Sequence, residues 1–250
     1  MDIQKLGLVT TLLLGAFILI GAFIAFLVNK KEKVVDFSLG LAFGVITMLI
    51  ITDLLPETIE HLGLKYIYLF LIFAVIGYGV LKILDHFIPD HEEENRSKKE
   101  ANANLVHIGI ITSCALVLHN IIEGMAIYST IITEANLGVM MTIGVGFHNI
   151  PLGMVIAGTF YQSNQNMSKT VLSLILVSLS TFVGGLILFF LDITMISPVI
   201  LGILLSVTLG MLLFITFDGL LPRIRETKNK KTTTIGIAIG AMILLIAVFI

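Results

Sequence analysis

Two apolar segments of the chain contain side chains of the kinds that bind metal ions. His119, Asn120 and Glu123 lie in the first segment, and His148 and Asn149 lie in the second. If each segment is an α-helix, residues 119 and 123 are one turn apart on the same face, so that the imidazole and the carboxylate converge. Imidazole nitrogen and carboxylate oxygen are common ligands of zinc, iron and manganese. These residues therefore predict a divalent-metal site between two helices.

The composition places both segments in a membrane. Of the 250 residues, 57% are hydrophobic and 13% are charged, and the mean hydropathy is +1.04, whereas about 25% of residues in soluble domains are charged. The net charge of −2 gives no basis for a nucleic-acid partner, and the single cysteine, Cys114, excludes a disulfide scaffold. The sequence contains no His-Glu-x-x-His or nucleotide-binding motif. We therefore expect a protein of the cell membrane, surrounded by lipid, that is not an enzyme.

Charged residues divide the chain into eight apolar runs, and a helix needs about 20 apolar residues to cross a bilayer. The predicted transmembrane helices cover residues 6–28, 34–55, 66–84, 105–132, 137–161, 170–191, 198–221 and 234–250. Lysine and arginine are retained on the cytoplasmic side of membranes, and all 15 except Lys5 and Lys65 fall in alternate loops. The sequence thus predicts an all-α polytopic membrane protein with eight transmembrane helices and both termini extracytoplasmic.

We interpret these helices as a single membrane domain, interrupted by one sizeable polar loop. Residues 1–84 contain the first three helices, residues 85–104 form a cytoplasmic loop, and residues 105–250 contain the remaining five. A run of charges of this kind is typical of a solvated linker. The metal-binding candidates in the loop, which are weaker than those in the helices, are His86, Asp90 and His91.

Short motifs recur in pairs. His119 and His148 both begin the pattern His-Asn-x-x-x-Gly, and Asp53-Leu54-Leu55-Pro56-Glu57 near the end of the second span is echoed by Asp218-Gly219-Leu220-Leu221-Pro222 in the seventh. Repeated polar motifs in different spans indicate a transporter with internal symmetry. His61, together with Glu57 and Glu60, is a candidate for attracting cations to the outer mouth, and an ordinary polar turn is the alternative.

Two other roles remain open for the polar residues inside the spans. A charged side chain at mid-bilayer costs about 2.5 to 3.5 kcal/mol on insertion scales. A cation would balance Glu123, but hydrogen bonding between helices is the alternative. A membrane redox protein would also place two histidines at equal depth, as axial ligands of haem iron. The haem interpretation gives no role to Glu123, Asn120 or Asn149.

The motifs resemble those of the Zrt/Irt-like (ZIP) family of divalent-metal transporters, in its bacterial and archaeal form. The family pattern has His-Asn-x-x-Glu-Gly in the fourth span, often His-Asn-Ile-Pro-Glu-Gly in the fifth, and Asp-Leu-Leu-Pro-Glu near the end of the second. The resemblance implies a ZIP-like bundle of eight helices that carries a divalent cation toward the cytoplasm. Zinc is the first candidate, and iron, manganese, cobalt and cadmium suit the same donors. It also implies a homodimer and no cofactor besides the transported ion.

The resemblance assigns roles to individual residues. His119, Glu123 and His148 match the principal metal site, and Asn120 and Asn149 match ligands of a neighbouring second metal position. The pathway residues that it implies, with less weight, are Asp53, Asp218 and Glu57.

The chain departs from the family pattern at two acidic positions. Leu152 replaces the glutamate of the fifth span, and Thr181 lies where the sixth span has a glutamate. Two divalent ions would bring four positive charges into a low-dielectric core with Glu123 as its only carboxylate, and unpaired buried charge is costly. We therefore predict an altered binuclear site that holds at most one metal. The alternative is a degenerate, non-transporting or regulatory homologue.

Overall fold

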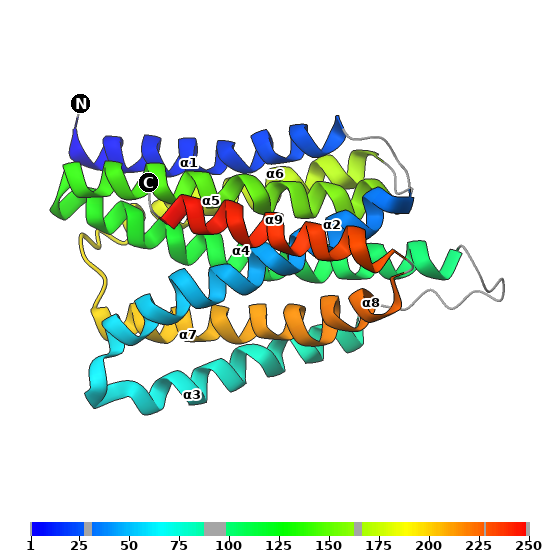
Figure 1. The fold of residues 1–250 in the computed structure, drawn as a ribbon. Coiled ribbons are helices and arrows are strands. Elements are labelled where there is room, and N and C mark those ends of the chain that lie inside the picture. The colour runs from blue at the N-terminus through cyan, green and yellow to red at the C-terminus, as the bar shows by residue number, and fades with distance from the viewer. Residues whose placement is uncertain (1, 28–31, 88–98, 163–166, 228, 249–250) are drawn as a thin grey trace.

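The computed structural model describes residues 2–27, 32–87, 99–162, 167–227 and 229–248, and within these ranges the chain is helical, without strands (Figure 1). The elements are α1 (Ile3–Phe26), α2 (Glu32–Leu49), η1 (Ile50–Leu54), α3 (Leu55–Phe87), α4 (Lys99–Thr133), α5 (Ala135–Gln162), α6 (Met167–Phe190), α7 (Pro198–Phe214), η2 (Ile215–Leu220), α8 (Leu221–Glu226) and α9 (Lys230–Val248). The segments η1 and η2 are π-helical.

Six stretches of the described residues are long and apolar enough to cross a membrane. They are Ile3–Phe26, Asp36–Phe87, Gly109–Thr133, Ala135–Gly158, Thr170–Phe190 and Pro198–Glu226. The predicted all-α class, with several helices able to span a membrane, is confirmed. The predicted number of eight spans and the extracytoplasmic position of both termini stay predictions.

The second stretch, 52 residues long, is not one straight helix. Gly63 adopts φ 60° and ψ 175°, a conformation that glycine reaches without the clash of a Cβ atom. The bend lies inside α3, and Figure 1 shows that α2 and the main part of α3 run in opposite directions. The stretch is therefore a helical hairpin, which joins two of the predicted spans.

The two acidic motifs of the sequence share a local structure. Asp53 lies in η1, which ends just before Leu55-Pro56, and Asp218 lies in η2, which ends just before Leu221-Pro222. Proline lacks an N–H, and its ring clashes with the carbonyl of the residue four positions earlier. A wider π-helical turn accommodates that lost hydrogen bond inside a helix. Each acidic side chain thus lies in a local widening of its helix.

The helices pack in two groups. In one group α1 packs against α5 and α6, and α4 packs against α6 and α5. The α2–α9 pair packs against α5 of this group, and the second group is the pair of α3 and α7. Small residues allow such close approach. A Cβ atom at Gly77 would overlap the backbone oxygen of Val207, and one at Gly210 would overlap that of Ala74, so α3 and α7 approach each other at a glycine from each side.

The connection between α4 and α5 sets the level of the metal-site candidates. Only Glu134 separates the two helices. His119 and His148 lie at nearly equal distances along the chain from this connection, on α4 and α5 respectively. Because α4 and α5 pack as antiparallel neighbours, the two histidines come to the same depth in the bundle.

The glycine contact between α3 and α7 leads to a matched pair of substitutions. Gly77→Ala is expected to destabilise the protein by about 1 to 3 kcal/mol, because the new Cβ atom overpacks the contact with Val207. Gly79→Ala, two residues further along the same helix, is the control, since no atom lies within 4 Å of its ideal Cβ position. The measurement is thermal unfolding of each purified variant in detergent. Equal loss of stability in both variants would contradict the close packing.

Candidate metal centre

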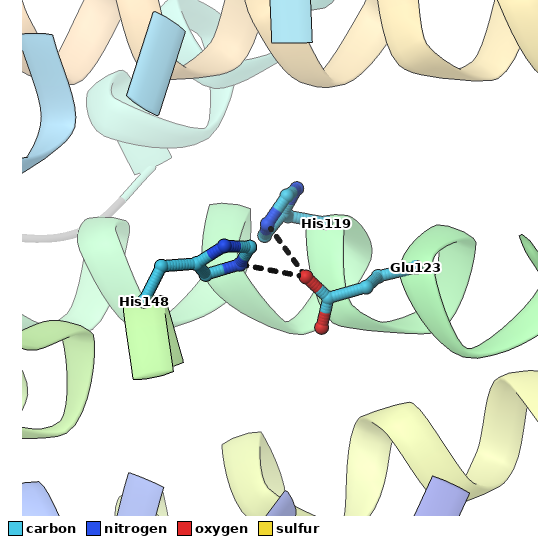
Figure 2. Close-up of side chains that lie close together, drawn as sticks. All are labelled: His119, Glu123 and His148. Carbon is cyan, nitrogen blue, oxygen red and sulfur yellow. Dashed lines mark hydrogen bonds and ion pairs between the residues drawn. The ribbon is translucent and has the colours of Figure 1, made fainter. Parts of the chain in front are cut away.

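Three side chains from two helices point toward one another in the bundle. Figure 2 shows His119 and Glu123 on α4 and His148 on α5. The Nε2 atom of His148 lies 2.9 Å from Oε1 of Glu123, and Nε2 of His119 lies 3.6 Å from the same oxygen. The ligand atoms of all three residues lie within 4.8 Å of one another. Two imidazoles and a carboxylate at these separations can bind one divalent cation.

The three side chains are enclosed by protein. His119 is 3% exposed, His148 is 6% exposed and Glu123 is 9% exposed. A carboxylate in such surroundings needs hydrogen-bond donors or a cation, because its desolvation is otherwise uncompensated. Nδ2 of Asn149 supplies one donor at 3.2 Å from Oε2 of Glu123. Glu123 therefore connects α4 and α5 through both of its oxygens.

Several buried polar atoms around Glu123 have no hydrogen-bond partner among the described residues. They are both ring nitrogens of His119, the Oδ1 atoms of Asn120 and Asn149, and Oγ1 of Thr181. Most buried polar atoms in proteins are paired, and an unpaired one costs about 1 to 3 kcal/mol. Nitrogen and oxygen atoms with free lone pairs are also the atoms that ligate metal ions. The unpaired atoms thus favour the binding of a cation over simple hydrogen bonding between helices.

The two asparagines use their amide nitrogens differently. Asn149 donates to Glu123, whereas Nδ2 of Asn120 donates to the backbone oxygen of Val177 on α6, at 3.0 Å. In both residues the carbonyl oxygen is the atom left unpaired. The position of Val177 could not be foreseen from the motif, because a backbone carbonyl on a distant helix leaves no signal in the sequence.

The two positions where the family pattern has glutamate are filled by neutral side chains. Leu152 is 1% exposed on α5, and Thr181 is fully buried on α6. A Cβ atom on Gly124 would overlap the backbone oxygen of Thr181. Because Gly124 has none, α4 and α6 lie close together beside Glu123. Within the described part of the chain, His119, Glu123 and His148 are the only three His, Cys, Asp or Glu residues grouped closely enough to hold a metal ion.

The weaker candidates lie away from this group. Asp53 is half-buried and interacts electrostatically with His148, Glu57 and Glu123. Glu57 pairs with His61, with 3.7 Å between Oε1 and Nε2. Asp53 and Glu57 therefore lie toward the core site without being part of it.

The remaining candidates are more distant. Asp218 is exposed and accepts a hydrogen bond from the hydroxyl of Tyr78, a partner that the sequence analysis did not identify. The Tyr78 ring also packs edge-on against Phe214, with 5.3 Å between ring centroids. His86 is exposed near the end of α3. The other two loop candidates, Asp90 and His91, lie outside the described residues.

Comparisons with known proteins identify the family to which the chain is similar. A family model described as ZIP Zinc transporter matches residues 86–247. The chain is 27% identical over 245 residues to the zinc transporter ZupT of Escherichia coli O7:K1 (strain IAI39 / ExPEC). The aligned region covers 96% of this chain and 95% of that protein. The zinc transporters ZupT of Enterobacter sp. (strain 638) and Escherichia coli (strain K12 / DH10B) match with the same identity and coverage.

The geometry around Glu123 predicts the effect of neutralising it. Glu123→Gln is expected to lower the affinity for zinc by about 100-fold or more, in line with the cost of about 3 kcal/mol for removing one partner of a buried charge pair. Glu134→Gln, at an exposed position between α4 and α5, is the charge-matched control. Calorimetric titration of the purified proteins with zinc measures the difference, and equal affinity in the two variants would refute the assignment of Glu123 as a ligand.

Proposed function

Because the chain belongs to the ZIP zinc transporter family, we propose that it carries zinc toward the cytoplasm through a site made by His119, Glu123 and His148. The observation that carries this proposal is the convergence of three buried ligand side chains at 4.8 Å or less. Two imidazoles, one carboxylate and an asparagine oxygen make four donors, which suit tetrahedral zinc. The same donors accept iron, manganese, cobalt and cadmium.

The topology that fits this function has eight spans. The hairpin at Gly63 divides the longest apolar stretch into two spans, and we assign α9, which is 19 residues long, as the eighth span. With eight spans, the lysine-rich and arginine-rich loops all fall on the cytoplasmic side and both termini fall outside. Residues 85–104, with His86, Asp90 and His91, then lie on the cytoplasmic side of one membrane domain, and this segment includes the end of α3 and the start of α4.

Three acidic residues are assigned to the pathway on either side of the core site. Glu57 and Asp53 belong to the α2–α3 hairpin, on the extracytoplasmic side in this topology, and Asp218 belongs to η2, on the cytoplasmic side. Carboxylates along a route lower the energy of a cation that has left water. Inward movement needs no coupled ion, because a potential of about 100 mV, negative inside, favours a divalent cation by about 2 × 2.3 kcal/mol.

The neutral residues at positions 152 and 181 limit the site to one metal ion. Glu123 is the only carboxylate among the proposed ligands. One bound divalent ion therefore leaves the site with a net charge of +1, and two bound ions would leave it with a net charge of +3. Such charge is costly in a buried site. A transported ion must also leave its site, so a weakly held single ion is compatible with transport. The same replacements favour the second candidate function, a non-transporting regulatory member of the family.

Uptake into proteoliposomes distinguishes these two functions. We expect saturable uptake of radioactive zinc by the purified protein, reduced to the level of empty liposomes in the double variant His119→Ala, Glu123→Ala. Competition by unlabelled manganese, iron and cobalt then ranks the metals. If neither zinc nor any competitor enters above the level of empty liposomes, the transport function is wrong and the regulatory function is favoured.

A single substitution tests the one-metal site. Leu152→Glu adds a carboxylate one helical turn after His148 and is expected to raise the number of tightly bound zinc ions from one to two. Leu152→Gln has nearly the same size without the charge and serves as the control. Equilibrium dialysis at zinc concentrations near that of the protein, followed by metal analysis, counts the ions. Two tightly bound ions in the unmodified protein would contradict the proposed limit.

A further inference from the structure

A histidine–glutamate pair outside the core repeats the geometry of the pair inside it. Glu57 and His61 are one turn apart on α3, and Oε1 and Nε2 are separated by 3.7 Å. His119 and Glu123 are one turn apart on α4, and the same two atom types are separated by 3.6 Å. In both pairs the helix holds an imidazole nitrogen and a carboxylate oxygen on one face. Each pair can therefore supply two ligands to one divalent cation.

The two pairs differ in their access to water. The side chains of His61 and Glu57 are 27% and 31% exposed, whereas those of His119 and Glu123 are 3% and 8% exposed. An exposed ion pair contributes little stability, about 0 to 1 kcal/mol. A cation can thus displace it at small cost and complete its coordination with water. The outer pair suits fast, weak binding, and its imidazole favours zinc-like ions over calcium and magnesium.

Asp53 connects the exposed pair with the core. It lies one turn before Glu57, and its carboxylate interacts electrostatically both with Glu57 and with His148 and Glu123. Figure 1 places the α2–α3 bend at the same end of the bundle as the N-terminus and the α6–α7 connection. Positions 61, 57 and 53 thus follow one another at four-residue intervals from that end, and the last of them interacts with the core site.

We propose that Glu57 and His61 form a second divalent-cation site, which captures metal at the mouth and passes it by way of Asp53 to the core. The loading role depends on the transport function proposed above, but metal binding by the pair does not. Capture at the mouth raises the concentration of ions available to the core without changing the core itself. Its loss therefore affects uptake at low metal concentration and has no effect at saturation.

Uptake kinetics test the loading role. The double variant Glu57→Gln, His61→Ala is expected to raise the apparent KM for zinc about fivefold, equivalent to about 1 kcal/mol, with unchanged maximal rate. Glu60→Gln removes the same charge from an exposed neighbour that is not in the pair, so its KM should match that of the unmodified protein. An unchanged KM in the double variant, or an equal rise in Glu60→Gln, would overturn the loading role.

Metal binding tests the site independently of transport. The full-length His119→Ala, Glu123→Ala protein is titrated with Co²⁺, and one weak site with the absorption of imidazole-bound cobalt is expected. Adding Glu57→Gln and His61→Ala should abolish it. A second titration covers the case in which the core variant does not fold. The unmodified protein should bind Co²⁺ in two affinity classes, one tight and one weak, and the Glu57→Gln, His61→Ala protein should show only the tight class. Failure to find the weak class in either titration overturns the outer site, whereas weak binding without any uptake overturns only the transport function.

Discussion

The buried carboxylate of Glu123 is the constraint on which the rest of the core depends. A single negative charge among apolar helices is tolerated only with donors or a cation around it. His148 and Asn149 reach it from α5, and His119 reaches it from one turn earlier on α4. The short connection at Glu134 keeps the two helices in the register that makes these contacts possible.

Close packing behind the site maintains this arrangement. Gly124, next to Glu123, faces the backbone of Thr181, and Gly184 faces the backbone of Ile121, so α4 and α6 approach each other at a glycine from each side. The amide of Asn120 adds a hydrogen bond to α6 beside these contacts. Such packing fixes the direction of the ligands, and a fixed direction reduces the entropy lost when a metal ion binds.

The sequence alone predicted the helical class and the convergence of His119, Glu123 and His148 at one depth. It did so because polar residues inside apolar runs are rare, and because the i, i+4 spacing of His119 and Glu123 determines a shared helix face. Contacts between distant segments could not be predicted in this way. The bond from Asn120 to Val177 and the bond from Tyr78 to Asp218 depend on which helices become neighbours, and no local pattern encodes that choice.

The two proline motifs place similar carboxylates in unlike surroundings. Asp53 interacts with the core and with the open pair of Glu57 and His61, whereas the Asp218 carboxylate accepts a hydrogen bond from Tyr78. A carboxylate that accepts one hydrogen bond keeps its other lone pairs, so Asp218 remains able to ligate an ion while the Tyr78 hydroxyl fixes its orientation. This difference does not determine the direction of transport, which follows the concentration gradient and the membrane potential. Under the proposed loading role, the exposed pair of Glu57 and His61 captures a scarce ion at the outer end, and its weak binding lets the ion move on to the core.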